Sequence, residues 1–211
     1  SINNTNGSPQ DNVTVNVYKT AHTATDLASY TESDATFAIN NVFGGGKLAS
    51  YLPVSDEQKA TVNVYGCDNT IRRVFGGGDA ASVRGVVTNI PGGRFDQVFG
   101  GGNGEVSPAD IGDGGINLSV SGGTIYQLFG GNNTSGDIAG PMTITVTNAG
   151  VCDENITEFF GGSNAAPMGT TTPVTLTTTI SCSTPPVNIA TVYGGSNLAD
   201  ITGDVTLTIE I

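Results

Sequence analysis

The sequence predicts an all-β protein wound as a parallel β-helix, and three observations lead to this fold class. Glycine accounts for 31 of the 211 residues and tryptophan for none, a composition that excludes an ordinary helical domain. A short glycine motif recurs six times along the chain. Each copy is preceded by a stretch in which Val or Ile alternates with polar residues, which is typical of a strand with one buried face.

The recurring motif is an apolar residue, an aromatic residue and a pair of glycines. Its copies are Val42–Gly46, Val74–Gly78, Val98–Gly102, Leu128–Asn132, Phe159–Ser163 and Val192–Ser196. The first glycines of successive copies lie 32, 24, 30, 31 and 33 residues apart. Such a period indicates a solenoid in which each unit contacts only its neighbours. The shortest interval suggests a unit of about 24 residues, with loops inserted in the others.

Each unit is expected to contribute three strands. The alternating strands are Val13–Val17, Val62–Val64, Val86–Ile90, Ile116–Val120, Met142–Val146, Val174–Leu176 and Val205–Ile209. A turn rich in Gly, Asn or Pro follows, and a second strand then starts at Ile39, Ile71, Phe95, Ile125, Ile156 or Ile189. A third, shorter strand is expected at Ser82-Val83, Asp110-Ile111, Asp137-Ile138 and Asp200-Ile201.

Without hairpin turns, these strands can pair only with their counterparts in the next unit, which gives parallel sheets and a right-handed winding. We therefore expect a three-sheet solenoid of about six to seven coils, forming one domain over residues 1–211 with regular repeats from about 12 to 211. Inserted loops are expected at about 19–35 and 47–60. Because the chain ends inside the strand-like VTLTIEI, we expect the natural protein to continue past Ile211.

Charge limits the classes of partner. The formal net charge is −12, and every Lys and Arg lies in residues 1–94, so nucleic acid and anionic lipid are not expected partners. No apolar run approaches the ~18 residues of a membrane span, so this segment is not expected to insert into a membrane.

On these motifs the chain resembles the right-handed parallel β-helix of the pectate-lyase-like superfamily. Its V-F-G-G-G/N units are similar to those of Gly-rich repeat surface proteins of Bacteroidetes. The resemblance specifies architecture more than function, since such solenoids include lyases, hydrolases, adhesins and structural rods. Polygalacturonases of this architecture carry Asn-Thr-Asp, Asp-Asp, His-Gly and Arg-Ile-Lys, and none of these strings occurs in this chain. No catalytic residue is therefore assigned.

Six aromatic residues occupy one position of the repeat and are expected to stack as a ladder. They are Phe43, Phe75, Phe99, Phe129, Phe160 and Tyr193. We favour an interior ladder, because six aligned exposed rings would make an apolar patch unusual for a soluble chain. If the ladder instead faced solvent, Phe99, Phe129, Phe160 and Tyr193 would form a platform on which sugar rings could stack.

A polar row follows the glycine pair, consisting of Asn103, Asn133, Asn164 and Asn197, with Lys47 and Asp79 at the earlier positions. We interpret it as structural, because Asn tolerates a left-handed corner and stacked amides can bond from coil to coil.

Among the three cysteines, Cys152 and Cys182 lie in the same corner of adjacent units and could form a disulfide. Cys67 and Cys152 hold matching positions but lie three units apart, which is expected to keep them separate.

Other candidate chemistry is sparse. The adjacent carboxylates Asp56-Glu57 and Asp153-Glu154 fall in loop-like stretches, where a solvated role is expected. Asp110 and Asp113 could offer two oxygen ligands to Ca²⁺, fewer than the six to eight that this ion takes. The single histidine, His22, lies in a Thr-rich insertion. No metal and no cofactor are expected.

The sequence therefore favours a non-catalytic β-helix that is secreted or displayed on the outer cell surface. It would act as an adhesin-like or glycan-contacting rod whose partner is a glycan or another host or cell-surface component. One alternative is a polysaccharide lyase or glycoside hydrolase with a site in the first half, among Arg72, Arg73, Arg84, Arg94 and nearby carboxylates. The other is a structural stalk.

Overall fold

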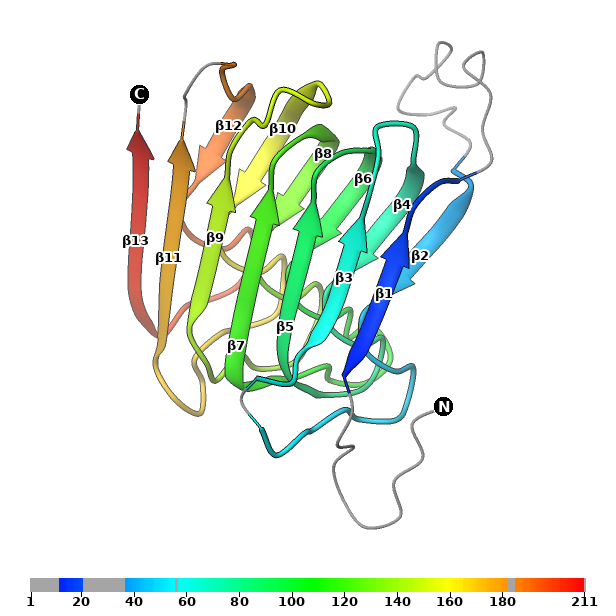
Figure 1. The fold of residues 1–211 in the computed structure, drawn as a ribbon. Helices are drawn as coiled ribbons and strands as arrows, with labels where there is room; N and C mark the ends of the chain where they lie inside the picture. The colour runs from blue at the N-terminus through cyan, green and yellow to red at the C-terminus, as the bar shows by residue number, and fades with distance from the viewer. Residues whose placement is uncertain (1–11, 21–36, 56, 182–184, 211) are drawn as a thin grey trace.

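The computed structural model describes residues 12–20, 37–55, 57–181 and 185–210 (Figure 1). Its described part contains thirteen strands and no helix. The predicted all-β parallel solenoid is therefore confirmed.

The strands form two sheets in which every pairing is parallel. The seven-stranded sheet contains, in order, β1 (Val13–Val17), β3 (Ala60–Val64), β5 (Val83–Ile90), β7 (Ile111–Val120), β9 (Met142–Val146), β11 (Val174–Ser181) and β13 (Gly203–Glu210). The six-stranded sheet contains β2 (Ile39–Phe43), β4 (Thr70–Phe75), β6 (Arg94–Phe99), β8 (Gly123–Phe129), β10 (Glu154–Phe160) and β12 (Ile189–Tyr193).

One odd-numbered strand and the even-numbered strand after it make up a coil. In Figure 1 the odd strands run upward in front and the even strands downward behind, while the chain advances from β1 on the right to β13 on the left. This winding is right-handed, as the crossover rule predicts. The expected third strand is reduced to isolated bridges, such as Ile111 with Ile138 and Met168 with Ile201.

The main core fills the space between the two sheets. Alternation in each strand places one row of Val, Ile, Leu and Met side chains inward; in β3, for example, Ala60, Val62 and Val64 are buried and the two residues between them are half-buried. Val62, Leu118 and Ile144 are fully buried in this core, and so are Val98 and Leu128 from the opposite sheet. The alternating sequence pattern thus predicted the buried face correctly.

The aromatic ladder forms a second, separate apolar cluster. Successive rings from Phe43 to Tyr193 stack with centroids 4.7 to 4.9 Å apart and planes within 10° of parallel. Phe75, Phe99 and Phe129 are fully buried and Phe160 is 5% exposed, whereas Tyr193 at the end of the ladder is 46% exposed. The ladder is interior along most of its length, and the solvent-facing platform is not available at Phe99, Phe129 or Phe160.

Close contact between coils explains the first glycine of the first five motifs, from Gly44 to Gly161. A Cβ on Gly76 would lie 2.2 Å from the carbonyl oxygen of Gly100, and one on Gly100 would lie 2.2 Å from that of Gly130. No side chain fits at such a distance. The glycine is therefore required by the approach of the next coil, since its φ is not in the left-handed region.

The expected loop at 19–35 falls mostly outside the described residues. In the expected loop at 47–60, Tyr51 is 2% exposed and forms an isolated bridge with Val83. The Arg84 guanidinium donates to the carbonyl oxygens of Pro53 and Val54. This part of the insertion therefore packs against the rod and supplies one side of its coil.

Replacing Phe99 by Ala should lower the free energy of unfolding by about 3–5 kcal/mol, because the lost ring leaves a cavity between two stacked neighbours. Denaturant unfolding monitored by circular dichroism measures the change. Tyr193→Ala is the matched control at the half-exposed end of the same ladder and should cost much less. An unchanged stability for Phe99→Ala would contradict the buried ladder.

Candidate functional site

The turns that carry the chain from odd to even strands lie along one long edge of the rod, the upper edge in Figure 1. We call this the turn edge; it comprises residues 18–20, 65–69, 91–93, 121–122, 147–153 and 185–188. The turns differ in length, and the longer ones bring polar, aromatic and sulfur-containing side chains together across several coils.

Two exposed tyrosines stack at the N-terminal part of the turn edge. Tyr18 and Tyr65 have ring centroids 5.1 Å apart and an interplanar angle of 11°. Tyr18 is 69% exposed and Tyr65 is 41% exposed. Each ends the tetrapeptide Val-Asn-Val-Tyr, at 15–18 and at 62–65, so the repeated string is a signal from which the pair could have been predicted.

A disulfide joins Cys67 to Cys152, with their Cα atoms 5.4 Å apart. The expectation that these cysteines are too far apart is wrong, and so is the proposed link from Cys152 to Cys182. Cys182 itself lies outside the described residues.

Turn length explains how the two cysteines meet. Cys67 and Cys152 occupy the long turns 65–69 and 147–153, while the two coils between them have only the short turns 91–93 and 121–122. A Cβ on Gly92 would lie 2.3 Å from Cys152 Sγ, and one on Gly122 would lie 3.3 Å from Cys152 Cβ. The disulfide therefore passes over two glycine turns that leave room for it, which a count of coils does not reveal.

Two hollows flank the disulfide. The smaller, of about 220 Å³, is lined by both cysteines and by Arg94, Thr124 and Asp153. The larger, of about 330 Å³, extends from Cys152 past Asn148 and Asn155 to Asn188. Amide, carboxylate and guanidinium groups at these hollows are donors and acceptors of the kind that sugar hydroxyls need.

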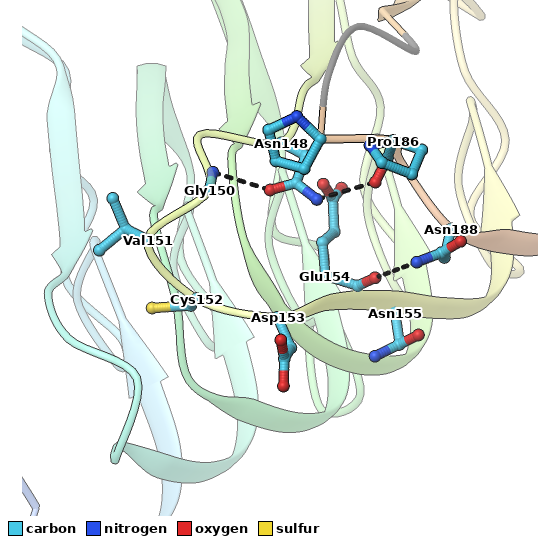
Figure 2. Close-up of a pocket in the computed structure, with 10 residues that line it drawn as sticks. Asn148, Gly150, Val151, Cys152, Asp153, Glu154, Asn155, Pro186 and Asn188 are labelled. Carbon is cyan, nitrogen blue, oxygen red and sulfur yellow. Dashed lines mark hydrogen bonds between the residues drawn. The ribbon is translucent and has the colours of Figure 1, made fainter.

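Glu154 is one of the residues that line the larger hollow, and Figure 2 shows its side chain directed away from Asp153 and Asn155. As the first residue of β10 it shares the inward face with Ile156 and is only 2% exposed. Neither carboxylate oxygen has a hydrogen-bond partner. Glu154 is therefore not the solvated residue that the sequence suggested, and it does not form a cooperating pair with Asp153.

Polar contacts close the site around Glu154 (Figure 2). The Asn148 side chain donates to the Pro186 carbonyl at 2.8 Å and accepts from the Gly150 amide at 2.9 Å. Burial raises the pKa of Glu154 from 4.5 to about 7, because nothing compensates the desolvated charge. The carboxyl is therefore largely protonated in slightly acidic solution.

The arginines proposed for a first-half active site are placed in separate contacts with acidic residues. Arg72 lies 3.6 Å from Asp96, and Arg73 lies 3.0 Å from Glu105. The Arg73 guanidinium also lies over the Phe75 ring, 5.8 Å from its centroid.

Arg84 and Asp113 contact each other at 2.9 and 3.2 Å, and this pairing lowers the pKa of Asp113. Arg94 lines the smaller hollow on the turn edge. The structure therefore does not bring these four arginines together around one pocket.

Asp110 and Asp113, the candidate calcium ligands, have different protein partners. Asp110 accepts from the Ser82 hydroxyl and from the Asp137 amide, whereas Asp113 pairs with Arg84. Within the described ranges, no three His, Cys, Asp or Glu residues form a group that could hold a metal ion.

The asparagine row is a continuous amide ladder. Each side-chain Nδ2 donates to the Oδ1 of the preceding coil, from Asn197 through Asn164, Asn133 and Asn103 to Asp79, at 2.8 to 2.9 Å. The structural interpretation of the row agrees with these bonds. None of these residues has a positive φ, so bonding between coils rather than a left-handed corner explains the asparagines.

No family model, curated protein or solved structure matches this chain. The description of the fold and of the turn edge therefore comes from this chain's own sequence and structure. The described residues contain no helix long and apolar enough to cross a membrane.

Peptide mapping without reductant should recover a peptide containing Cys67 linked to one containing Cys152. Removing both cysteines should cost about 4–5 kcal/mol of stability, since the link closes a sequence separation of 85 residues. Cys182→Ala is the control and should leave the linked peptide unchanged. Recovery of a Cys152–Cys182 peptide would contradict the structure.

Glu154→Gln should remove a pH-dependent loss of stability. The unfolded carboxyl ionises near its ordinary pKa of 4.5 and the folded one near 7, so the native protein should lose stability as pH rises through this interval. The loss attributable to Glu154 should total about 3 kcal/mol, at about 1.4 kcal/mol per unit of pKa. Thermal melting of both proteins at pH 4 and pH 8 measures it. The two should differ more at pH 8 than at pH 4; an equal difference would contradict the assignment.

Proposed function

We propose that the protein is a non-catalytic, exported β-solenoid that contacts glycans along its turn edge. The stacked, exposed pair Tyr18 and Tyr65 is the observation that carries this proposal. An exposed aromatic ring offers an apolar face to a sugar, and polar groups nearby can bind its hydroxyls. The hollows at Arg94 and Asn148 extend such groups from the tyrosines along the same edge.

The disulfide supports export, because disulfides persist in oxidising compartments and are rare in the cytosol. The repeat-built architecture supports the same proposal through its resemblance to Gly-rich surface proteins of Bacteroidetes and to the pectate-lyase-like β-helices. We accordingly place the protein outside the cell or on its outer surface, with a glycan or a glycan-bearing cell-surface component as its partner.

Two observations favour binding over catalysis at this edge. The carboxyl of Glu154 is buried in the wall of the larger hollow, and that of Asp153 is directed the other way (Figure 2). A glycosidase needs two carboxyl groups on opposite sides of one bond, both reachable by the sugar. The tests below also address the two alternatives. Cleavage of a polysaccharide would indicate a lyase or hydrolase with a site elsewhere, and the absence of glycan binding would favour a structural stalk.

Binding of the purified chain to neutral and acidic polysaccharides should be detectable on a glycan array and by calorimetry. Tyr18→Ala should weaken it about fivefold or more, the scale of one aromatic contact, without lowering the melting temperature appreciably. Tyr193→Ala, at the exposed end of the ladder, is the control on a different surface. Equal weakening by both variants, or no binding at all, would contradict a turn-edge site.

The same polysaccharides should be recovered intact after prolonged incubation with the protein. Reducing-end and unsaturated-product assays measure cleavage. Turnover that increases with protein concentration would overturn the non-catalytic proposal and favour the enzyme alternative.

A further inference from the structure

One buried acid on the turn edge has no partner for its side chain. Glu154 is only 2% exposed, and neither of its carboxylate oxygens accepts a hydrogen bond. Buried polar groups in folded proteins are almost always hydrogen-bonded, and an unpaired buried carboxyl costs stability. Glu154 also lines the larger hollow, which has a volume of about 330 Å³. An unsatisfied acceptor in the wall of a hollow indicates a binding position for a donor.

The donors drawn around this carboxyl in Figure 2 are directed at other acceptors. The Asn148 side-chain amide donates to the Pro186 carbonyl at 2.8 Å, and the Gly150 amide donates to the Asn148 side chain at 2.9 Å. The Asn188 side-chain amide donates to the backbone carbonyl of Glu154, 3.4 Å away, and not to its carboxyl. The carboxyl is therefore left for a donor that comes from outside the chain.

The lining of the hollow favours a positively charged ligand. Its described residues include the acids Asp153 and Glu154 and three asparagines, and none of them is Lys or Arg. A sulfated or carboxylated sugar would meet like charge at this place. A protonated amine carries a positive charge and three N–H donors in one small group, so it can satisfy a carboxylate and neighbouring amide oxygens together.

A metal ion is less well suited to the same place. Hard cations such as Ca²⁺ take six to eight oxygen ligands, but the Asp153 carboxyl is directed away from that of Glu154 (Figure 2). In the part of the chain that the structure describes, no three His, Cys, Asp or Glu side chains come together as a metal site. One carboxyl with amide oxygens nearby matches the three donors of an ammonium group better than the coordination shell of a metal ion.

The cover over the carboxyl can open without disturbing the base of the hollow. Both hydrogen bonds of the Asn148 side chain are solvent-exposed, so turning this side chain outward breaks no buried hydrogen bond. Cys152, in contrast, is held by its disulfide to Cys67. The base of the hollow therefore stays in place when its rim opens.

We propose that the larger hollow binds the free ammonium group of an amino sugar against the Glu154 carboxylate. This inference rests on the proposed glycan function and names the class of sugar, one whose amine is not acetylated. Acetylation removes the charge and two of the three donors, so the N-acetylated form of the same sugar should bind more weakly. A single carboxyl that holds a ring substituent does not make a hydrolase, because hydrolysis needs a second carboxyl on the other side of the bond.

A lysine side chain of a partner protein offers the same ammonium group. The sugar is favoured because the same edge carries the exposed, stacked rings of Tyr18 and Tyr65, which can receive the apolar face of a sugar ring.

Calorimetric titration at pH 6 with two oligomers of equal length tests the site: a β-1,4-linked glucosamine tetramer and its fully N-acetylated counterpart. The native chain should bind the free-amine oligomer more tightly by about tenfold or more, the scale of one hydrogen bond to a charged group. Glu154→Gln should abolish this preference, because the amide carries no charge. Asp153→Asn is the matched control. It removes the same charge from the adjacent residue, whose carboxyl is directed elsewhere, and should keep the preference.

Binding should also release a proton from Glu154. Burial raises the pKa of Glu154 to about 7, so the free protein holds this carboxyl mostly protonated at pH 6, and an ammonium group against it favours the ionised form. The measured binding enthalpy should therefore depend on the ionisation enthalpy of the buffer for the native chain and for Asp153→Asn. Glu154→Gln should lose this dependence. A purely structural role for Glu154 predicts the same buffer dependence in all three proteins.

The outcomes separate the amino-sugar site from the glycan proposal. Equal binding of the two oligomers, or a preference that survives Glu154→Gln, would overturn the amino-sugar site and leave the glycan proposal standing. If neither oligomer and no glycan on the array binds, both fail. Tetralysine should bind more weakly than the glucosamine tetramer; equal binding with the same dependence on Glu154 would assign the ammonium to a protein side chain and overturn the sugar assignment.

Discussion

Each coil of this rod lies so close to the next that the first glycine of the repeated motif has no room for a Cβ. This approach brings equivalent residues of successive coils into register, and the ladders depend on that register. Phenylalanine rings then lie 4.8 to 4.9 Å apart, the spacing of paired strands, so that one position in the repeat becomes a stack. The asparagine amides meet their counterparts for the same reason.

The turn edge escapes this regularity, because turn length is not set by the contact between coils. Where the turn is as short as Ser121-Gly122, nothing projects; where it runs over 147–153, the chain can reach across its neighbours to Cys67. The turn edge thus consists of regular, stacked coils that carry turns of different lengths. Scaffolds of this kind commonly carry binding residues on the loops that a regular framework positions.

The ends of the rod follow from the same repeat. A coil buries its apolar row only when another coil lies on each side, so Leu207 and Ile209 in the last described coil are exposed. A solenoid needs some covering for such an end, since an open strand edge invites pairing with another chain.

The sequence alone determined the repeat, the parallel pairing, the right-handed winding and the row that each residue joins. These follow from local periodicity, because in a stacked solenoid each repeat packs mainly against the repeats next to it. The third strand is reduced to single parallel pairings at positions where it was expected, namely Val83, Ile111, Ile138 and Ile201.

Only the tertiary structure decided which cysteines meet, that Glu154 is buried, and that the tyrosines of the two Val-Asn-Val-Tyr strings form one exposed stack. The cysteine and tyrosine contacts depend on how far a turn extends across neighbouring coils. The burial of Glu154 depends on which face of β10 its first residue occupies. A count of residues gives the coil to which a group belongs. Such a count does not give the direction in which an irregular turn extends. That direction is set by packing against turns remote in the sequence, as where Cys152 packs on the glycines at 92 and 122.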